Sequence, residues 1–223
     1  MLEFVVDTEH PIIIPTQDVH LEGLLHIPRS AKGMVIFAHG SGSSRLSPRN
    51  QYIARTLQGA HFATLLFDLL TPEEDEADTR TMAFRFDIDL LCDRLLAATN
   101  WVLSNPVLHQ LPMGYFGAST GGGAALVAAA KEGKLISAVV SRGGRPDLAD
   151  QALAHVKAPT LLIVGGDDHV VIELNEKAYA ALQCEKKLEI VPGASHLFEE
   201  AGKLEEVARL ASVWFQHYLV VSD

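Results

Sequence analysis

The residues most suggestive of chemistry are Gly117-Ala118-Ser119-Thr120-Gly121. They follow an apolar run at 113–116 and precede a stretch of small residues at 122–125. A G-x-S-x-G placed between a strand and a helix makes a sharp turn that exposes the serine hydroxyl at the carboxyl end of a sheet. The helix N-terminus behind it offers free N–H groups to a developing oxyanion. This context predicts a nucleophilic serine, and the alternative is a glycine-rich loop without chemistry.

A serine hydroxyl needs a base to take its proton, and the base needs a carboxylate to orient it. With a serine on such a turn, the chain order is serine, acid, histidine. Among the histidines after Ser119, His196 follows the last apolar run, in a turn at 192–196 that can reach back to the serine. His169 adjoins the candidate acids, and the others precede a strand or lie on the last helix. His196 is therefore the predicted base.

The acid is expected in the loop 165–171, which follows the apolar run at 160–164. This loop contains two neighbouring aspartates, Asp167 and Asp168. One would accept a hydrogen bond from the imidazole, whereas the other could cap the following helix. Spacing alone does not separate the two.

A second glycine-rich loop, His39-Gly40-Ser41-Gly42, follows the apolar run at 34–38. Its small residues would allow a backbone N–H to approach the nucleophile and to bind an oxyanion together with the N–H of Thr120. Loss of one such donor typically lowers turnover about 10²–10³-fold. A phosphate-binding interpretation is disfavoured because no Lys-Ser/Thr pair follows the loop.

The elements that must position these loops are predicted from hydrophobic patterning. Unalternated apolar runs are typical of strands buried on both faces of a parallel sheet, and they occur at 34–38, 62–67, 114–117, 137–141, 160–164 and 188–191. Stretches of helix length separate them, at 48–58, 84–104, 120–131, 172–183 and 199–219. This alternation predicts a doubly wound, mostly parallel α/β sandwich.

The remaining segments complete this picture. Short segments rich in Val and Ile predict antiparallel strands before the parallel sheet, at 3–7, 11–15 and 20–27. The polar stretch 71–81 is expected to be an exposed loop. Residues 1–223 are expected to form a single domain.

Composition excludes several classes of protein. The chain has 223 residues, of which 48% are hydrophobic, and its longest apolar runs fall well short of the ~20 residues that span a bilayer. Its formal net charge of −10 disfavours nucleic acid or an anionic membrane as a partner. Cys92 and Cys184 form neither a disulfide framework nor a metal-binding spacing. The acidic N-terminal residues do not show the pattern of a secretory signal, so we expect none there. We expect a cytoplasmic protein that needs no metal or cofactor.

Taken together, these motifs resemble those of α/β-hydrolases, and more narrowly of the dienelactone hydrolase-like family. The acid loop of such enzymes usually reads G-x-x-D-x-x-V, a frame that Gly165, Asp168 and Val171 fit. The resemblance therefore implies a triad of Ser119, Asp168 and His196, with oxyanion N–H groups from Ser41 and Thr120. The enzymes that give the family its name use a cysteine nucleophile, so the serine here implies serine-type ester hydrolysis. The short connection from 141 to 160 implies that the fold carries no large lid domain.

Several arginines lie near the rim of this expected site. Arg45 follows the oxyanion loop, and Arg142 and Arg145 follow the run at 137–141. Arginine prefers carboxylate or phosphate partners, so one interpretation is that these residues bind a small anionic ester. The other is that they pair with nearby Asp and Glu side chains, as Arg145 would with Asp147.

The sequence thus predicts a serine hydrolase that cleaves a small-molecule carboxylic ester or lactone through an acyl-enzyme. Two alternatives remain open. The same triad would serve an acyltransferase or a perhydrolase, because the acyl-enzyme is shared. A binding protein that keeps this fold without catalysis is the other alternative, since fold does not fix function.

Overall fold

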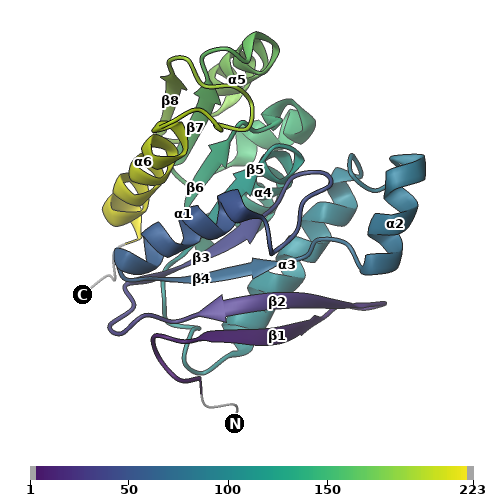
Figure 1. Ribbon diagram of the computed structural model, residues 1–223, viewed down its shortest axis with the longest axis vertical. Coiled ribbons are helices and arrows are strands. Elements are labelled where there is room, and N and C mark those ends of the chain that lie inside the picture. Colours follow the sequence, from purple (N-terminus) through teal and green to yellow (C-terminus); the bar gives the residue numbers. More distant parts are fainter. Residues whose placement is uncertain (1–3, 220–223) are drawn as a thin grey trace.

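A sheet of eight strands forms the centre of the computed structural model, which describes residues 4–219 (Figure 1). The strand order is β1-β2-β4-β3-β5-β6-β7-β8. Strand β2 is antiparallel to both β1 and β4, and all the other pairs are parallel. The strands are β1 (Glu9–Pro15), β2 (His20–His26), β3 (Gly33–Ala38), β4 (Phe62–Phe67), β5 (Met113–Ala118), β6 (Ile136–Arg142), β7 (Thr160–Gly165) and β8 (Lys186–Val191). The predicted α/β-hydrolase type of sheet is confirmed.

Helices cover both faces of this sheet and create two apolar layers. Helices α3 (Ile88–Ser104), α4 (Thr120–Glu132) and α5 (His169–Ala181) pack on one face, and α1 (Pro48–Gly59) and α6 (Lys203–Tyr218) pack on the other. Every residue of β3, β4, β5 and β7 is buried, which explains why these strands are unbroken apolar runs in the sequence. The carboxyl ends of the parallel strands meet at one edge of the sheet, where the glycine-rich loops lie.

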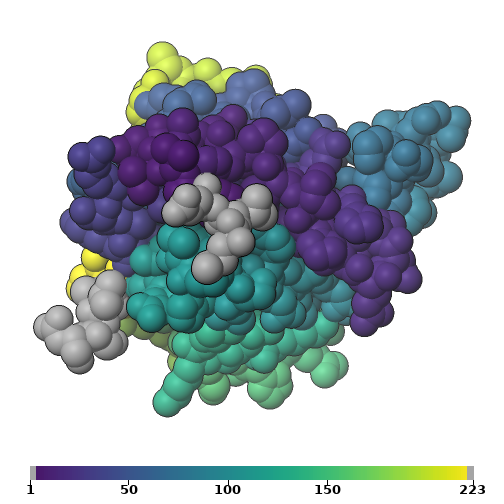
Figure 2. Space-filling view, turned by 90° about the horizontal axis from the view of Figure 1, so that it is seen from below, coloured from purple at the N-terminus to yellow at the C-terminus, as the bar shows by residue number. Residues whose placement is uncertain are grey.

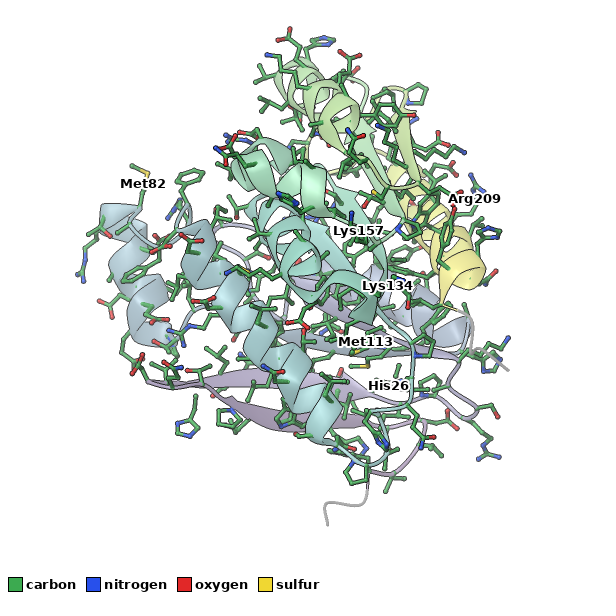
Figure 3. All side chains as sticks on the ribbon, turned by 180° about the vertical axis from the view of Figure 1, so that it is seen from behind. His26, Met82, Met113, Lys134, Lys157 and Arg209 are labelled. Atoms are coloured by element: carbon green, nitrogen blue, oxygen red, sulfur yellow. The ribbon has the colours of Figure 1, made fainter. Side chains whose placement is uncertain are left out.

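One predicted loop is a helix. The polar stretch expected to be an exposed loop forms α2 (Pro72–Thr81), which projects from the body of the protein (Figures 1 and 2). The Thr71 hydroxyl accepts the N–H of Glu74, and the Glu74 carboxylate accepts the N–H of Thr71, a capping box. Acidic residues in the first turn stabilise the helix, because their negative charge interacts favourably with the positive end of the helix dipole. Met82 ends the helix in a left-handed conformation and lies at its outer tip (Figure 3).

Smaller differences concern the ends of elements. The strand predicted at 3–7 is wrong for residues 4–7, and residue 3 lies outside the described residues. There, the Thr8 hydroxyl donates to the Val5 carbonyl oxygen at 2.7 Å, and Asp7 has a φ of 60°, so the chain turns. The helix predicted from residue 84 begins at Ile88 after the N-cap Asp87, and the helix predicted from residue 199 begins at Lys203.

The connection between β6 and β7 carries no inserted lid domain. It is formed mainly by the 3₁₀ segment Pro146–His155, which is interrupted by a kink at Asp150 and packs against α4 and α5. The edge of the sheet that carries the glycine-rich loops is therefore not covered by a domain inserted at this point. None of the helices in residues 4–219 is long and apolar enough to cross a membrane.

Candidate active site

Ser119 occupies a strained turn between β5 and α4. Its backbone has φ 51° and ψ −123°, a region that costs a non-glycine residue about 1–3 kcal/mol. Three hydrogen bonds hold it: the Ser119 N–H donates to the carbonyl of Arg142 at 3.2 Å, and the Ser119 carbonyl accepts from the N–H groups of Gly122 and Arg145, each at 2.9 Å. The half-buried side chain makes no capping hydrogen bond to α4. Among the described residues, none forms a hydrogen bond with the Ser119 hydroxyl.

The two glycines of the G-x-S-x-G pattern are required by packing. A Cβ on Gly117 would lie 2.5 Å from the carbonyl oxygen of Gly121, and a Cβ on Gly121 would lie 2.2 Å from that of Ala38. Both distances are far below van der Waals contact. These glycines therefore allow β5, α4 and β3 to meet closely behind Ser119.

His196 and Asp168 are in direct contact. The Nδ1 atom of His196, in the loop after β8, lies 2.6 Å from Oδ2 of Asp168, in the loop after β7. Because the carboxylate is an acceptor, Nδ1 carries the proton, and Nε2 of the neutral ring is left as an acceptor. A Cβ on Gly143 would lie 3.5 Å from two atoms of this ring. Gly143 follows Arg142, whose carbonyl holds the Ser119 N–H, so the imidazole lies beside the segment that anchors the serine.

The two neighbouring aspartates differ in their surroundings. Asp168 is the N-cap residue of α5, yet its side chain makes no capping bond and contacts His196 instead. Asp167 is exposed, and its backbone N–H donates to the carbonyl of Ala194 at 3.0 Å. The carboxylate that meets the imidazole is thus that of Asp168.

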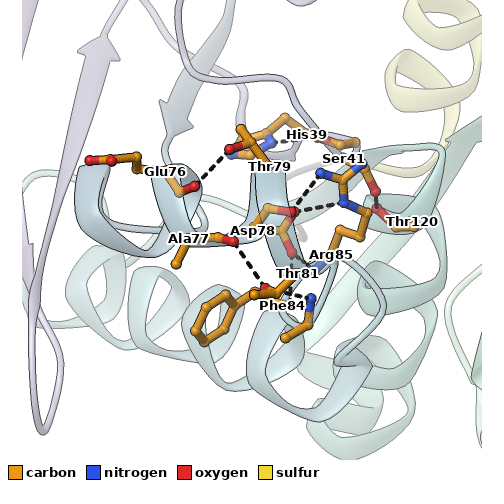
Figure 4. Close-up of polar contacts among 12 residues, drawn as sticks. His39, Ser41, Glu76, Ala77, Asp78, Thr79, Thr81, Phe84, Arg85 and Thr120 are labelled. Carbon is orange, nitrogen blue, oxygen red and sulfur yellow. Dashed lines mark hydrogen bonds and ion pairs between the residues drawn. The ribbon is translucent and has the colours of Figure 1, made fainter.

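The loop after β3 lies directly against the serine. A Cβ on Gly40 would be 2.9 Å from the Cβ of Ser119, so only glycine fits there without displacement. The hydroxyl oxygens of Ser41 and Thr120 are 3.1 Å apart (Figure 4). The structure therefore brings together the two residues whose N–H groups were expected to bind an oxyanion.

His39 fixes this loop, although the sequence assigned it no separate role. Its Nε2 accepts the backbone N–H of Leu69 at 2.9 Å, and its Nδ1 is 2.9 Å from the carbonyl oxygen of Gly40. This pattern requires a neutral ring with the proton on Nδ1. Burial lowers the pKa of His39 below its usual value. Its position immediately before Gly40 is the only sequence signal for this role.

A small pocket opens beside Ser41 and Thr120. It is lined by His39, Gly40, Ser41, Gly42, Leu69, Leu70, Asp75, Arg85, Leu91 and Thr120. Arg85 is held in it by Asp78 of α2, whose carboxylate accepts the Arg85 Nε–H at 2.7 Å and the backbone N–H groups of Phe84 and Arg85 (Figure 4). Burial alone would raise the pKa of Asp78, but these hydrogen bonds outweigh it and hold that pKa below its usual value.

The arginines singled out in the sequence have different environments. Arg45 is paired with Asp68 and Glu22. Arg145 binds both carboxylate oxygens of Asp147, at 2.7 and 2.8 Å. Arg45 and Arg145 therefore pair with nearby acidic side chains, as the second interpretation of these arginines expects. Arg142 differs, because it is buried and no carboxylate of the described residues forms an ion pair with it.

A larger hollow lies elsewhere. It has a volume of about 730 Å³ and lies between the β1–β2 turn, at 15–18, and one side of α3. None of the predicted site residues lines it. This hollow is therefore separate from the end of the sheet that carries Ser119, Asp168 and His196.

Comparison with solved structures agrees with this architecture. A dienelactone hydrolase from Anabaena variabilis is 61% identical, with a TM-score of 0.93 over 95% of this chain and 98% of that one. Est1E from Butyrivibrio proteoclasticus is 16% identical, with a TM-score of 0.78 over 93% and 98% of the two chains. XC6422 from Xanthomonas campestris, described as a serine hydrolase without a lid, is 20% identical, with a TM-score of 0.77 over 99% and 100%. The last two likenesses concern the fold alone.

Curated relatives add a second kind of comparison. Two proteins from Mycobacterium tuberculosis, each named "Putative phosphoribosyl transferase", are 58% identical over 201 residues. That match covers 90% of this chain and 44% of each relative, so the chain spans less than half the length of these proteins. The model of the dienelactone hydrolase family matches residues 21–218. With its sheet, its glycine-rich loops and this match, the chain belongs to the dienelactone hydrolase family.

Proposed function

We propose that this hydrolase cleaves small-molecule carboxylic esters or lactones by forming an acyl-enzyme at Ser119. The contact that carries the proposal is the 2.6 Å hydrogen bond between His196 and Asp168. Serine hydrolases need a nucleophile, a base and a group that orients the base. The strained turn of Ser119 and the hydrogen bond between His196 and Asp168 support this assignment of roles.

In the proposed reaction, Nε2 of His196 takes the proton of the Ser119 hydroxyl as Oγ attacks the ester carbonyl carbon. The backbone N–H groups of Ser41 and Thr120 bind the oxyanion that forms. The tetrahedral intermediate collapses when His196 returns the proton to the leaving alcohol oxygen. In a lactone this oxygen remains attached to the acyl group as a free hydroxyl. Water, activated by His196, then hydrolyses the acyl-enzyme.

The surroundings support a small substrate. The pocket beside Ser41 is lined by three apolar side chains, Leu69, Leu70 and Leu91, and by two charged ones, Asp75 and Arg85. No domain inserted between β6 and β7 supplies a long apolar channel. The pocket has a volume of about 10 Å³, room for about one water molecule, so it offers no space for a fatty acyl chain.

The name of the curated relatives suggests a different chemistry, but the match covers 44% of each of those proteins. A name given to the whole protein does not specify what the matched part does. We assign ester hydrolysis to the part that corresponds to this chain.

The experiment that tests the proposal is labelling with a fluorophosphonate, followed by peptide mapping. We expect one modified peptide, carrying the label on Ser119. We also expect Ser119→Ala to abolish the label and the hydrolysis of p-nitrophenyl acetate while melting near the wild-type temperature. Labelled protein in the alanine variant, or an unlabelled folded wild type, would contradict the proposal.

Product analysis separates hydrolysis from acyl transfer. Wild-type protein is given a short activated ester with water alone, and then with added peroxide or alcohol. Hydrolysis predicts mainly the free acid in both cases. A product that is chiefly the peracid or the new ester would assign the same triad to transfer chemistry.

A further inference from the structure

Arg142 is a buried cation without an acidic partner. Its residue is 6% exposed, and no carboxylate of the described residues lies within 4 Å of its guanidinium. Nη2 makes one long hydrogen bond, 3.4 Å, to Oδ1 of Asn50, and the buried Nε has no described partner. The nearby charge of Arg49 has the same sign, and burial together with this charge lowers the pKa of Arg142 to about 10.

Stability does not explain an arginine at this position. Its neighbours across the sheet, Ala118 and Ile163, are buried apolar residues of β5 and β7. A buried charge without a counter-ion is costly, and an apolar side chain of similar volume is often tolerated as well or better. The position therefore calls for a role that an apolar residue cannot fill.

Arg142 lies between the anchor of the serine and the loop of the histidine. Its backbone carbonyl accepts the Ser119 N–H. Its guanidinium carbon lies 5.9 Å from the centre of the Phe198 ring, within reach of a cation–π contact. Phe198 stands two residues after His196, is 1% exposed, and has a φ of 57°, which is unusual for a bulky residue.

Hydrogen bonds close the turn that contains His196 and Phe198. The Phe198 N–H donates to the carbonyl of Ser195 at 3.2 Å, and the Ser195 N–H donates to the carboxylate of Glu200 at 3.1 Å. These two hydrogen bonds close one turn from Ser195 to Glu200, and this turn carries both His196 and Phe198. A group that contacts the Phe198 ring therefore contacts the turn that carries the imidazole, without touching the triad itself.

We propose that Arg142 is a positioning residue for His196: its guanidinium, oriented by Asn50 of α1, supports the Phe198 ring and so fixes the turn that aims the imidazole at Ser119. The inference rests on the proposed triad. A planar guanidinium can contact the Phe198 ring and, at the same time, donate a hydrogen bond to the amide oxygen of Asn50. A lysine ammonium is a strongly hydrated point charge and lacks this geometry.

The test compares Arg142→Met and Arg142→Lys with wild type, and uses Arg209→Met as a matched control. Arg209 is an exposed arginine on α6. Its Nε and Nη2 atoms donate to the two carboxylate oxygens of Glu206. For Arg142→Met we expect an unchanged or raised melting temperature, because the buried charge is gone. We also expect Ser119 labelling and turnover to fall about tenfold to a hundredfold, with little change in KM, because small displacements of a base are costly.

Proton NMR gives a readout that needs no substrate. The His196 Nδ1–H shared with Asp168 is expected to give a protected downfield resonance in wild type. It should broaden or exchange faster in Arg142→Met and Arg142→Lys, and remain unchanged in Arg209→Met. A Phe198→Leu variant should show the same loss, and adding Arg142→Met to it should cost little more, because both changes remove one contact.

The outcomes separate this inference from the proposed function. An unlabelled wild-type Ser119 overturns the triad, whereas the resonance and the melting temperature still report on Arg142. A lower melting temperature in Arg142→Met would show a structural role and overturn the inference. Wild-type turnover, or an unchanged Nδ1–H signal, in that variant would overturn it as well.

Discussion

At the scale of single residues, the two neighbouring aspartates provide the sharpest test of the site. Asp168→Asn removes the negative charge at Nδ1 of His196, and its amide can present an N–H there, which favours the ring tautomer with Nε2 protonated. That ring cannot accept the Ser119 proton. We expect turnover and the rate of fluorophosphonate labelling to fall about 10³–10⁴-fold.

Asp167→Asn is the matched control, since this neighbouring side chain is exposed and does not contact His196. Its labelling rate should stay within about twofold of wild type, as is usual for surface substitutions. Equal losses in the two variants would mean that the Asp168 contact is not what prepares the histidine.

Asp167 and Asp168 also show which features of single residues the sequence does not predict. Alternatives at neighbouring positions differ only in the direction of a side chain, and spacing along the chain does not determine that direction. The partners of Arg45 present a similar problem, because Glu22 and Asp68 come from β2 and from the end of β4. Such partners become visible only when the strand order is known. The sharp turn at Ser119 was predictable because it has a local sequence signature.

At the scale of elements, helix α2 is expected to shape the pocket through one buried carboxylate. Asp78→Asn removes the charge that holds Arg85 Nε and weakens the acceptor of two backbone N–H groups. Because α2 projects from the body, we expect local loosening of residues 82–87 rather than global unfolding (Figure 1). KM for a short ester should rise several-fold, with a smaller change in kcat, and limited proteolysis should cut this segment faster.

Glu76→Gln on the same helix is the control. Glu76 is an exposed residue whose only described ion pair is a long surface contact, 3.6 Å, with Arg80. Such pairs contribute about 0–1 kcal/mol, so KM and proteolysis should be unchanged. If Asp78→Asn behaves like this control, α2 does not shape the pocket.

Helix α2 was also the element that patterning missed. Its only buried residue is Asp78, so it lacks the apolar stripe by which helices are recognised. The capping box of Thr71 and Glu74 and the proline at the first position were the available signals. The parallel strands were predictable for the opposite reason, since burial on both faces leaves unbroken apolar runs.

At the scale of the whole molecule, the strand directions explain why the candidate site residues lie at the same end of the sheet. Ser119, Asp168 and His196 follow β5, β7 and β8, whose carboxyl ends lie at one edge. The alternation of strand and helix predicted this edge, because crossovers in parallel sheets bring successive loops to the same end. The order of strands and the depth of the pocket depend on long-range packing, which local patterns do not specify.

The last prediction concerns how stability depends on pH. His39 is buried and accepts the Leu69 N–H on Nε2, and burial lowers its pKa below the value of 6.5 expected for an unfolded chain. The unfolded state therefore binds more protons as the pH falls through 6.5. The free energy of unfolding is retained above this pH and decreases below it. Asp78, whose pKa is also lowered, adds a further loss only when carboxylates begin to protonate.

The net charge of −10 acts in the opposite direction, because acidification reduces self-repulsion. That repulsion is spread over a screened surface, whereas protonation of His39 breaks a buried hydrogen bond, so we expect the local effect to dominate. Melting temperatures measured from about pH 7.5 to 5 should fall, with the fall beginning near the ordinary histidine pKa. His39→Gln keeps an acceptor but does not titrate, so its profile should be flatter. Some slope should remain from His26, whose pKa is also lowered by burial. Parallel profiles for wild type and His39→Gln would show that His39 does not control acid stability.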